Sequence, residues 1–349
     1  MKENASDKRN SSIELLRILL ILGVIQIHYN VAGIGNGFRY LKIGTVNQVY
    51  SLIIHAVCIN AVSIFVMISG YYLVNTNKRK LSKVYELMIQ SIIFVAVQYL
   101  FIQKRNYDYF TMLWFPILYC ILYVISPYLN LIIEKCAKKQ LKTIIIVLIT
   151  LFSIEPMLID YIQSFTGETL LGISCIGYFG SNYGFTEINF ILLYIIGAYI
   201  RKYGIDMKKI KKISYLLVVI ALIVLMSILE CEFSKEGINT WNYDNPLIII
   251  SAALVLDMFT SVKFYNKSIN ELAKASFTVY LFHFYFIINW VSIPEFINQP
   301  IYLLVLHQIC TATSLYLIGY IAYKIWRLIT SKLSNKLEPI INKIDISLH

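Results

Sequence analysis

Ten apolar segments, separated by short polar stretches, take up most of this 349-residue chain. Each is close to the roughly 20 residues that an α-helix needs to cross a bilayer. Hydrophobic residues make up 58% of the chain and charged residues only 15%, against about 25% charged in soluble domains. The sequence therefore predicts an all-α, polytopic integral membrane protein. The expected spans are 12–32, 49–74, 84–102, 111–133, 143–159, 185–200, 213–230, 245–262, 276–293 and 301–326.

The distribution of Lys and Arg predicts how these spans are oriented. With a cytoplasmic N-terminus, 25 of the 31 Lys and Arg residues fall in inner segments and five in outer loops, and Arg17 lies within the first span. Cytoplasmic loops are enriched in basic residues, so both termini are expected in the cytoplasm. We expect one membrane domain over residues 1–349, with short cytoplasmic tails at 1–11 and 327–349. The apolar stretch at 169–180 is too short to span and is predicted to re-enter the membrane or to cap the outer face.

Nucleic-acid and metal sites are not supported by the sequence. The net charge of +11 follows from the enrichment of basic residues in cytoplasmic loops and needs no nucleic-acid partner. The six cysteines are scattered, with no Cys-x-x-Cys and no other metal-ligand spacing. We therefore expect no metal cofactor.

A face of ionisable side chains runs along the first span, SIELLRILLILGVIQIHYNVA. Arg17 and His28 are eleven positions apart, and at about 100° per residue eleven steps return a helix to within roughly 20° of its starting direction. The two side chains thus share a face, about 16 Å apart, and Glu14 lies near it. An Arg inside a span costs about 2.5–3.5 kcal/mol, so this face is expected to line a polar interior. Glu14 and Arg17 are three residues apart, a spacing at which two side chains of a helix can pair. The pair could form the polar end of a tunnel, a salt bridge that fixes the span, or both.

Intramembrane histidines are the candidates for proton transfer. His28 and His55 lie near the outer ends of the first two spans, which run antiparallel, so their imidazoles are expected at similar depth. Either could act as a general base on a hydroxyl. A lone intramembrane His is more often a structural hydrogen-bond partner, but the face shared with Arg17 and Glu14 favours a catalytic role for His28.

His55 and three further residues are candidate substrate contacts. His283 lies near the middle of the ninth span, with Tyr280 one turn before it. Trp114 lies at the outer end of the fourth span, where aromatic side chains also serve as interfacial anchors.

The inner end of the second span reads FVMISGYYL and leads into a basic loop. Ser69 and Gly70 indicate either a close packing point or a break in the helix. Lys78, Arg79 and Lys80 follow. A basic cytoplasmic loop usually reflects topology alone, although the same charges would bind the phosphates of an anionic cosubstrate.

Together these segments resemble membrane acyltransferase family 3, a bacterial group that O-acylates surface polysaccharides and related glycoconjugates. The resemblance rests on IELLRILLILGVIQIH, FVMISGYYL with the basic loop after it, WFPILYCILYVISPYLN and SFTVYLFH. The Trp-Phe of the third segment is similar to the subgroup from capsule and exopolysaccharide clusters. The resemblance implies a ten-helix domain in the cell membrane that uses cytoplasmic acyl-CoA, usually acetyl-CoA, as cosubstrate.

The resemblance also implies roles for individual residues. His28 corresponds to the catalytic His and Arg17 to its essential partner, and Glu14 stands where the family often has Asp. The implied donor-binding residues are those of the Ser-Gly-Tyr motif and of the basic loop: Ser69, Gly70, Tyr71, Lys78, Arg79 and Lys80. The loop reads Lys-Arg-Lys and not Arg-x-x-Arg, so its individual contacts with CoA are left open.

These features predict an integral-membrane O-acyltransferase. It would transfer an acyl group, expected to be acetyl, from acyl-CoA to a hydroxyl of a surface polysaccharide or lipid-linked glycan. Some relatives carry a C-terminal hydrolase-like domain. We expect no such domain here, so transfer is expected to finish within the membrane domain or with a partner from polysaccharide biosynthesis. The alternative is a transporter or flippase of a lipid-linked sugar, which would not account for the Arg-His face. A polysaccharide polymerase is disfavoured because the outer loops carry few basic residues.

Overall fold

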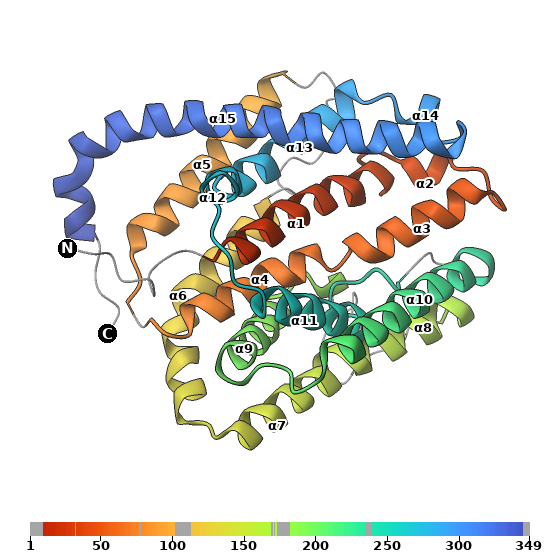
Figure 1. Ribbon diagram of the computed structural model, residues 1–349, viewed down its shortest axis with the longest axis horizontal. Helices are drawn as coiled ribbons and strands as arrows, with labels where there is room; N and C mark the ends of the chain where they lie inside the picture. The colour runs from red at the N-terminus through yellow and green to blue at the C-terminus, as the bar shows by residue number, and fades with distance from the viewer. Residues whose placement is uncertain are drawn as a thin grey trace. The chain divides into compact units, whose positions relative to one another are not determined.

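A computed structural model describes residues 10–31, 33–76, 78–101, 113–168, 170, 172, 182–234 and 239–344. Every regular element in these ranges is a helix (Figure 1), which confirms the all-α prediction for this part of the chain. The predicted re-entrant stretch at 169–180 lies almost wholly outside the described residues. Residues 1–9 and 345–349 of the predicted tails also lie outside the described residues.

Seven helical segments of the described chain are long and apolar enough to cross a bilayer. They contain α1 (Ser11–Asn30), α3 (Val46–Cys58) with α4 (Ala61–Leu73), α5 (Leu81–Phe101), α6 (Trp114–Lys135), α7 (Lys138–Ile149) with η3 (Thr150–Ile154) and α8 (Glu155–Thr166), α10 (Lys209–Phe233) and α15 (Ile301–Ile344).

The other three predicted spans are shorter helices. They are α9 (Glu187–Tyr203), α11 (Pro246–Thr260) and α13 (Ser276–Trp290), with 17, 15 and 15 residues. The remaining elements are short: α2 (Gly37–Tyr40), η4 (Asn182–Gly184), α12 (Lys267–Ala273) and α14 (Ile293–Phe296). The count of ten spans and the cytoplasmic location of both termini stay predictions.

The chain divides into two compact units that interleave along the sequence. The first unit consists of Met1–Cys58, Phe94–Tyr107 and Met258–Ile340. The second unit consists of Ile59–Ile93, Asp108–Asp257 and Ile341–His349. The predicted second span is thus divided, because α3 ends at Cys58 in the first unit and α4 begins at Ala61 in the second.

Helix α1 is the central element of the first unit and packs against α3, α12 and α13. The side chain of Asn10 caps its start by accepting a hydrogen bond from the backbone N–H of Ser12 at 3.1 Å. The Ser12 hydroxyl donates to the carbonyl of Phe259 at 2.8 Å, and the Ser11 N–H donates to that of Phe264 at 3.0 Å. These bonds fix the first turn of α1, which carries Glu14, one turn before Arg17.

Close contact between α4 and α9 organises the second unit. A Cβ atom on Gly70 would lie 2.0 Å from the carbonyl oxygen of Tyr194, and one on Gly197 would lie 2.0 Å from that of Met67. The paired positions run in opposite directions, so the two helices are antiparallel. Of the two interpretations of Gly70, the structure supports the close packing point: α4 continues through Gly70 to Leu73.

Candidate active site

Arg17 and His28 lie on one uninterrupted helix, so the spacing in the sequence becomes a shared face. Helix α1 runs from Ser11 to Asn30 without a break, and eleven residues are about three turns. The Arg17 side chain is 30% exposed and His28 is partly exposed, whereas Glu14 is buried, at 1%. The two positively ionisable groups are therefore the accessible members of this face.

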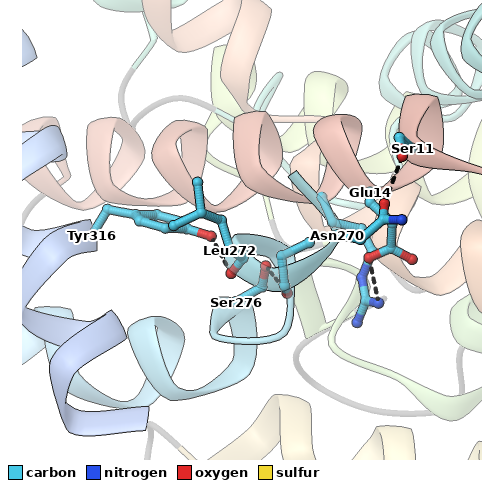
Figure 2. Close-up of polar contacts among 8 residues, drawn as sticks. Ser11, Glu14, Asn270, Leu272, Ser276 and Tyr316 are labelled. Atoms are coloured by element: carbon cyan, nitrogen blue, oxygen red, sulfur yellow. Dashed lines mark hydrogen bonds and ion pairs between the residues drawn. The ribbon is translucent and has the colours of Figure 1, made fainter. Parts of the chain in front are cut away.

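The buried Glu14 carboxylate pairs with Arg17, with 3.4 Å between Oε2 and Nη1. Figure 2 shows the polar contacts around this pair, which come from α1, α12, α13 and α15. The Ser11 hydroxyl donates to Oδ1 of Asn270 at 2.7 Å, and the Tyr316 hydroxyl donates to the carbonyl of Leu272 at 2.9 Å. The expected ion pair is thus present, and it lies where four elements of the first unit meet.

His28 lies against a second imidazole from α13. Its Nδ1 is 2.6 Å from Nε2 of His283, and the two rings are nearly parallel, with centroids 4.8 Å apart. The ring of Phe284 packs on both imidazoles, at 4.4 Å from His28 and 4.6 Å from His283. His283 is buried, at 1% exposure, and its Nδ1 lies 2.6 Å from the carbonyl oxygen of Tyr280. The fold thus joins three predicted site residues, His28, His283 and Tyr280.

Two other intramembrane histidines have different surroundings. His55 is buried in α3, and its ring meets the ring of Phe38 edge to face at 5.4 Å. His307 of α15 lies 2.8 Å from the hydroxyl of Tyr29 and stacks on Phe296 at 4.0 Å. The predicted catalytic or substrate role of His55 stays a prediction.

In the second unit, Arg79 is held by its own chain. It is 2% exposed. Its Nε donates to the hydroxyl of Ser126 at 2.8 Å, its Nη1 to the carbonyl of Thr76 at 2.7 Å and its Nη2 to the carbonyl of Leu73 at 3.2 Å. A cation at the C-terminal end of α4 also complements the helix dipole. Arg79 therefore has a structural role, and its contact with a donor stays a prediction; its neighbours Lys78 and Lys80 are exposed.

The YVISPYLN segment of α6 supplies partners for this loop. Pro127 has no N–H for the carbonyl of Tyr123, and the Ser126 hydroxyl donates to that carbonyl at 2.7 Å instead. The amide of Asn130 donates to the carbonyl of Leu73 at 2.8 Å and accepts a hydrogen bond from the Tyr194 hydroxyl at 2.7 Å. Sequence reasoning did not assign these roles. The only signal in the sequence was the presence of Ser126 and Asn130 within a family-like segment.

The other members of the predicted donor set have partners in the second unit. The Ser69 hydroxyl lies 3.5 Å from that of Tyr119. The guanidinium of Arg201 donates to the Tyr71 hydroxyl at 3.0 Å and lies over the Tyr71 ring at 4.8 Å. Arg201 was not predicted as a site residue, because in the sequence it is one of many basic residues in predicted inner segments.

Trp114, the remaining candidate, begins α6 and belongs to an aromatic cluster. Its ring lies 4.5 Å from that of Phe185 and 5.9 Å from that of Tyr243, to which it is nearly parallel. These contacts account for its position by packing, and its contact with a sugar stays a prediction.

Comparison with known proteins identifies the family of this chain. A family model described as "Acyltransferase domain" matches residues 10–324, which is most of the chain. No curated protein and no solved structure matches the chain significantly. The matched residues include His28 and His283, the Arg17–Glu14 pair and the basic loop. The chain belongs to membrane-bound acyltransferase family 3.

Proposed function

We propose that this membrane acyltransferase moves an acetyl group from acetyl-CoA to a hydroxyl of a surface polysaccharide or its lipid-linked precursor, in the cell membrane of a bacterium. Family membership supports acyl transfer. The observation that supports proton transfer is the His28 imidazole, which is partly exposed and held at one nitrogen by the buried His283. An oriented imidazole within a membrane domain is suited to deprotonate a hydroxyl.

The proposed reaction needs one group that can take and return a proton. His28 accepts the proton of the sugar hydroxyl while the oxygen attacks the carbonyl carbon of the thioester. The C–S bond breaks, the thiolate of CoA takes the proton back from His28, and the glycan carries a new ester. General-base assistance of this kind contributes about 10²–10⁴-fold to the rate.

The donor is proposed to bind through its phosphates. Lys78 and Lys80 are exposed, and ammonium groups form strong charge-assisted bonds with phosphate oxygens. Arg79, held between Ser126 and the end of α4, keeps these two lysines in place. Ser69, Gly70 and Tyr71 are proposed to contribute to the same donor site.

Arg17 is proposed to keep the buried end of the face polar. Its side chain stays 30% exposed while paired with Glu14, and its buried Nε has no hydrogen-bond partner among the described residues. The pair offsets much of the cost of an Arg inside a span.

The test uses the purified full-length chain in lipid vesicles, supplied with acetyl-CoA and with surface glycan from a strain that lacks this protein. We expect release of free CoA thiol that depends on the glycan, and a glycan that gains acetyl esters by mass spectrometry. Translocation of a lipid-linked sugar without thiol release would refute the proposal and favour the flippase alternative.

A further inference from the structure

We propose that His283 is a positioning residue: it fixes the tautomer of His28 so that the Nε2 atom of His28 is the one that takes the proton from the acceptor hydroxyl. This inference rests on the proposed function, in which His28 is the base. It adds the identity of the reacting atom and a role for a second imidazole, 255 residues away in the sequence.

The tautomer of His283 is determined by the hydrogen bonds of its Nδ1, the nitrogen that does not face His28. Its Nδ1 lies 2.6 Å from the carbonyl oxygen of Tyr280 and 3.2 Å from that of Val279. Carbonyl oxygens only accept hydrogen bonds, so Nδ1 of His283 must carry a hydrogen. In a neutral imidazole the other nitrogen is then an acceptor, which makes Nε2 of His283 an acceptor.

This acceptor determines the protonation of His28. Nε2 of His283 lies 2.6 Å from Nδ1 of His28, so Nδ1 of His28 must donate. The hydrogen of a neutral His28 is therefore on Nδ1, and its Nε2 keeps a free lone pair. Without His283, either nitrogen of His28 could carry the hydrogen, and only one of the two tautomers presents a base at Nε2.

The contacts of His283 also explain why it can hold His28 in place. Its own Nδ1 bonds to carbonyls one turn earlier in α13, so its ring is fixed relative to its helix. The Phe284 ring packs against both imidazoles and restricts their rotation. When His28 takes up a proton at Nε2, its Nδ1–H still donates to His283. A nucleophile, a base and a group that orients the base form the general pattern of such sites.

The most direct test measures the tautomer itself. Nitrogen NMR of the full chain in lipid, labelled with ¹⁵N-histidine, distinguishes protonated from unprotonated ring nitrogens. The His28 signals are assigned by their loss in His28→Gln. We expect a protonated Nδ1 and an unprotonated Nε2 at His28. A His28 that carries its hydrogen on Nε2 would overturn the proposal.

A matched pair of substitutions tests the consequence for catalysis. His283→Gln keeps a hydrogen-bond acceptor at a similar reach, whereas His283→Met has a similar length and lacks a good acceptor. We expect kcat to fall by about 10²-fold in His283→Met, the low end of what a general base contributes. His283→Gln should retain most of the activity, and KM for acetyl-CoA should change little in either variant. The same two substitutions at His307, which bonds to Tyr29, are the controls and should be nearly neutral for kcat.

The outcomes separate this inference from the proposed function. If His28→Ala is inactive but His283→Met and His283→Gln are equally active, the positioning role of His283 is refuted and the function stands. If His28→Ala keeps its activity, the function itself fails. Thermal unfolding in detergent identifies variants that are inactive because they are misfolded. For such a variant, the tautomer measurement on the unsubstituted chain decides.

Discussion

Replacing Gly70 by Ala tests whether the Ser-Gly-Tyr motif contributes through helix packing. A Cβ at this position would lie 2.0 Å from the carbonyl oxygen of Tyr194, whereas ordinary van der Waals contact begins at 3.4 Å. The backbones of α4 and α9 would have to separate locally by about 1.4 Å, the difference between these two distances. A gap of about 1 Å already forfeits up to half of the dispersion energy of each contact that it opens.

The contact that must open is one of the best packed in the second unit. Ile64, Val66 and Met67 of α4 and Leu192 and Tyr194 of α9 are all fully buried. Overpacking of a rigid core costs about 1–3 kcal/mol, and we expect the upper end here, because the obstacle is backbone and not a flexible side chain. The assay is thermal unfolding of the purified full chain in detergent, in which Gly70→Ala should lower the midpoint by several degrees.

Two controls make this prediction specific. Gly23→Ala in α1 should be tolerated, because its Cβ would meet Cys58 at 3.5 Å, an ordinary contact. Gly197→Ala should behave like Gly70→Ala, because its Cβ would lie 2.0 Å from the carbonyl oxygen of Met67. The double substitution should cost less than the sum of the two, since one separation of the helices accommodates both methyl groups. A Gly70→Ala variant with an unchanged midpoint would refute the packing argument.

Two further predictions concern charged groups of the second unit. Lys78→Gln with Lys80→Gln should raise KM for acetyl-CoA several-fold at unchanged stability, and an unchanged KM in this variant would leave the loop with a topological role only. Arg79→Gln should mainly lower the unfolding midpoint, because it removes the charge-assisted hydrogen bonds that the buried guanidinium donates to Ser126, Thr76 and Leu73, at about 1.5–3 kcal/mol each. Lys212→Met should destabilise the chain by about 3–5 kcal/mol in the same thermal assay, because it leaves the buried Asp257 carboxylate without its ion-pair partner; equal stability of this variant and the unsubstituted chain would refute that role.

The sequence predicted local features of the fold well. Helices occur at all ten predicted spans, because the length and composition of an apolar segment are local properties. The face shared by Arg17 and His28 follows from helix periodicity alone. The division between α3 and α4 was not predicted. The residues between the two helices, Ile59 and Asn60, are neither Pro nor Gly, which would mark a break.

Features that depend on tertiary contacts were beyond sequence reasoning. The pairing of His28 with His283 requires α1 to pack on α13, and no local pattern encodes that choice. Arg79 is a second example. The sequence predicts it only as one of three basic residues in a loop, whereas in the structure its buried guanidinium donates to the Ser126 hydroxyl and to a carbonyl at the end of α4. Only the arrangement of α4 and α6 in space distinguishes it from Lys78 and Lys80.

The proposed reaction depends above all on the His28 imidazole as the proton acceptor. The most direct measurement is the acetyl content of the cell-surface glycan, by mass spectrometry, in a strain that carries His28→Ala in place of the native chain. We predict a glycan without acetyl esters, with the variant present in the membrane at the normal level, while His307→Ala leaves acetylation unchanged. Acetylation at the native level in the His28→Ala strain would contradict the account.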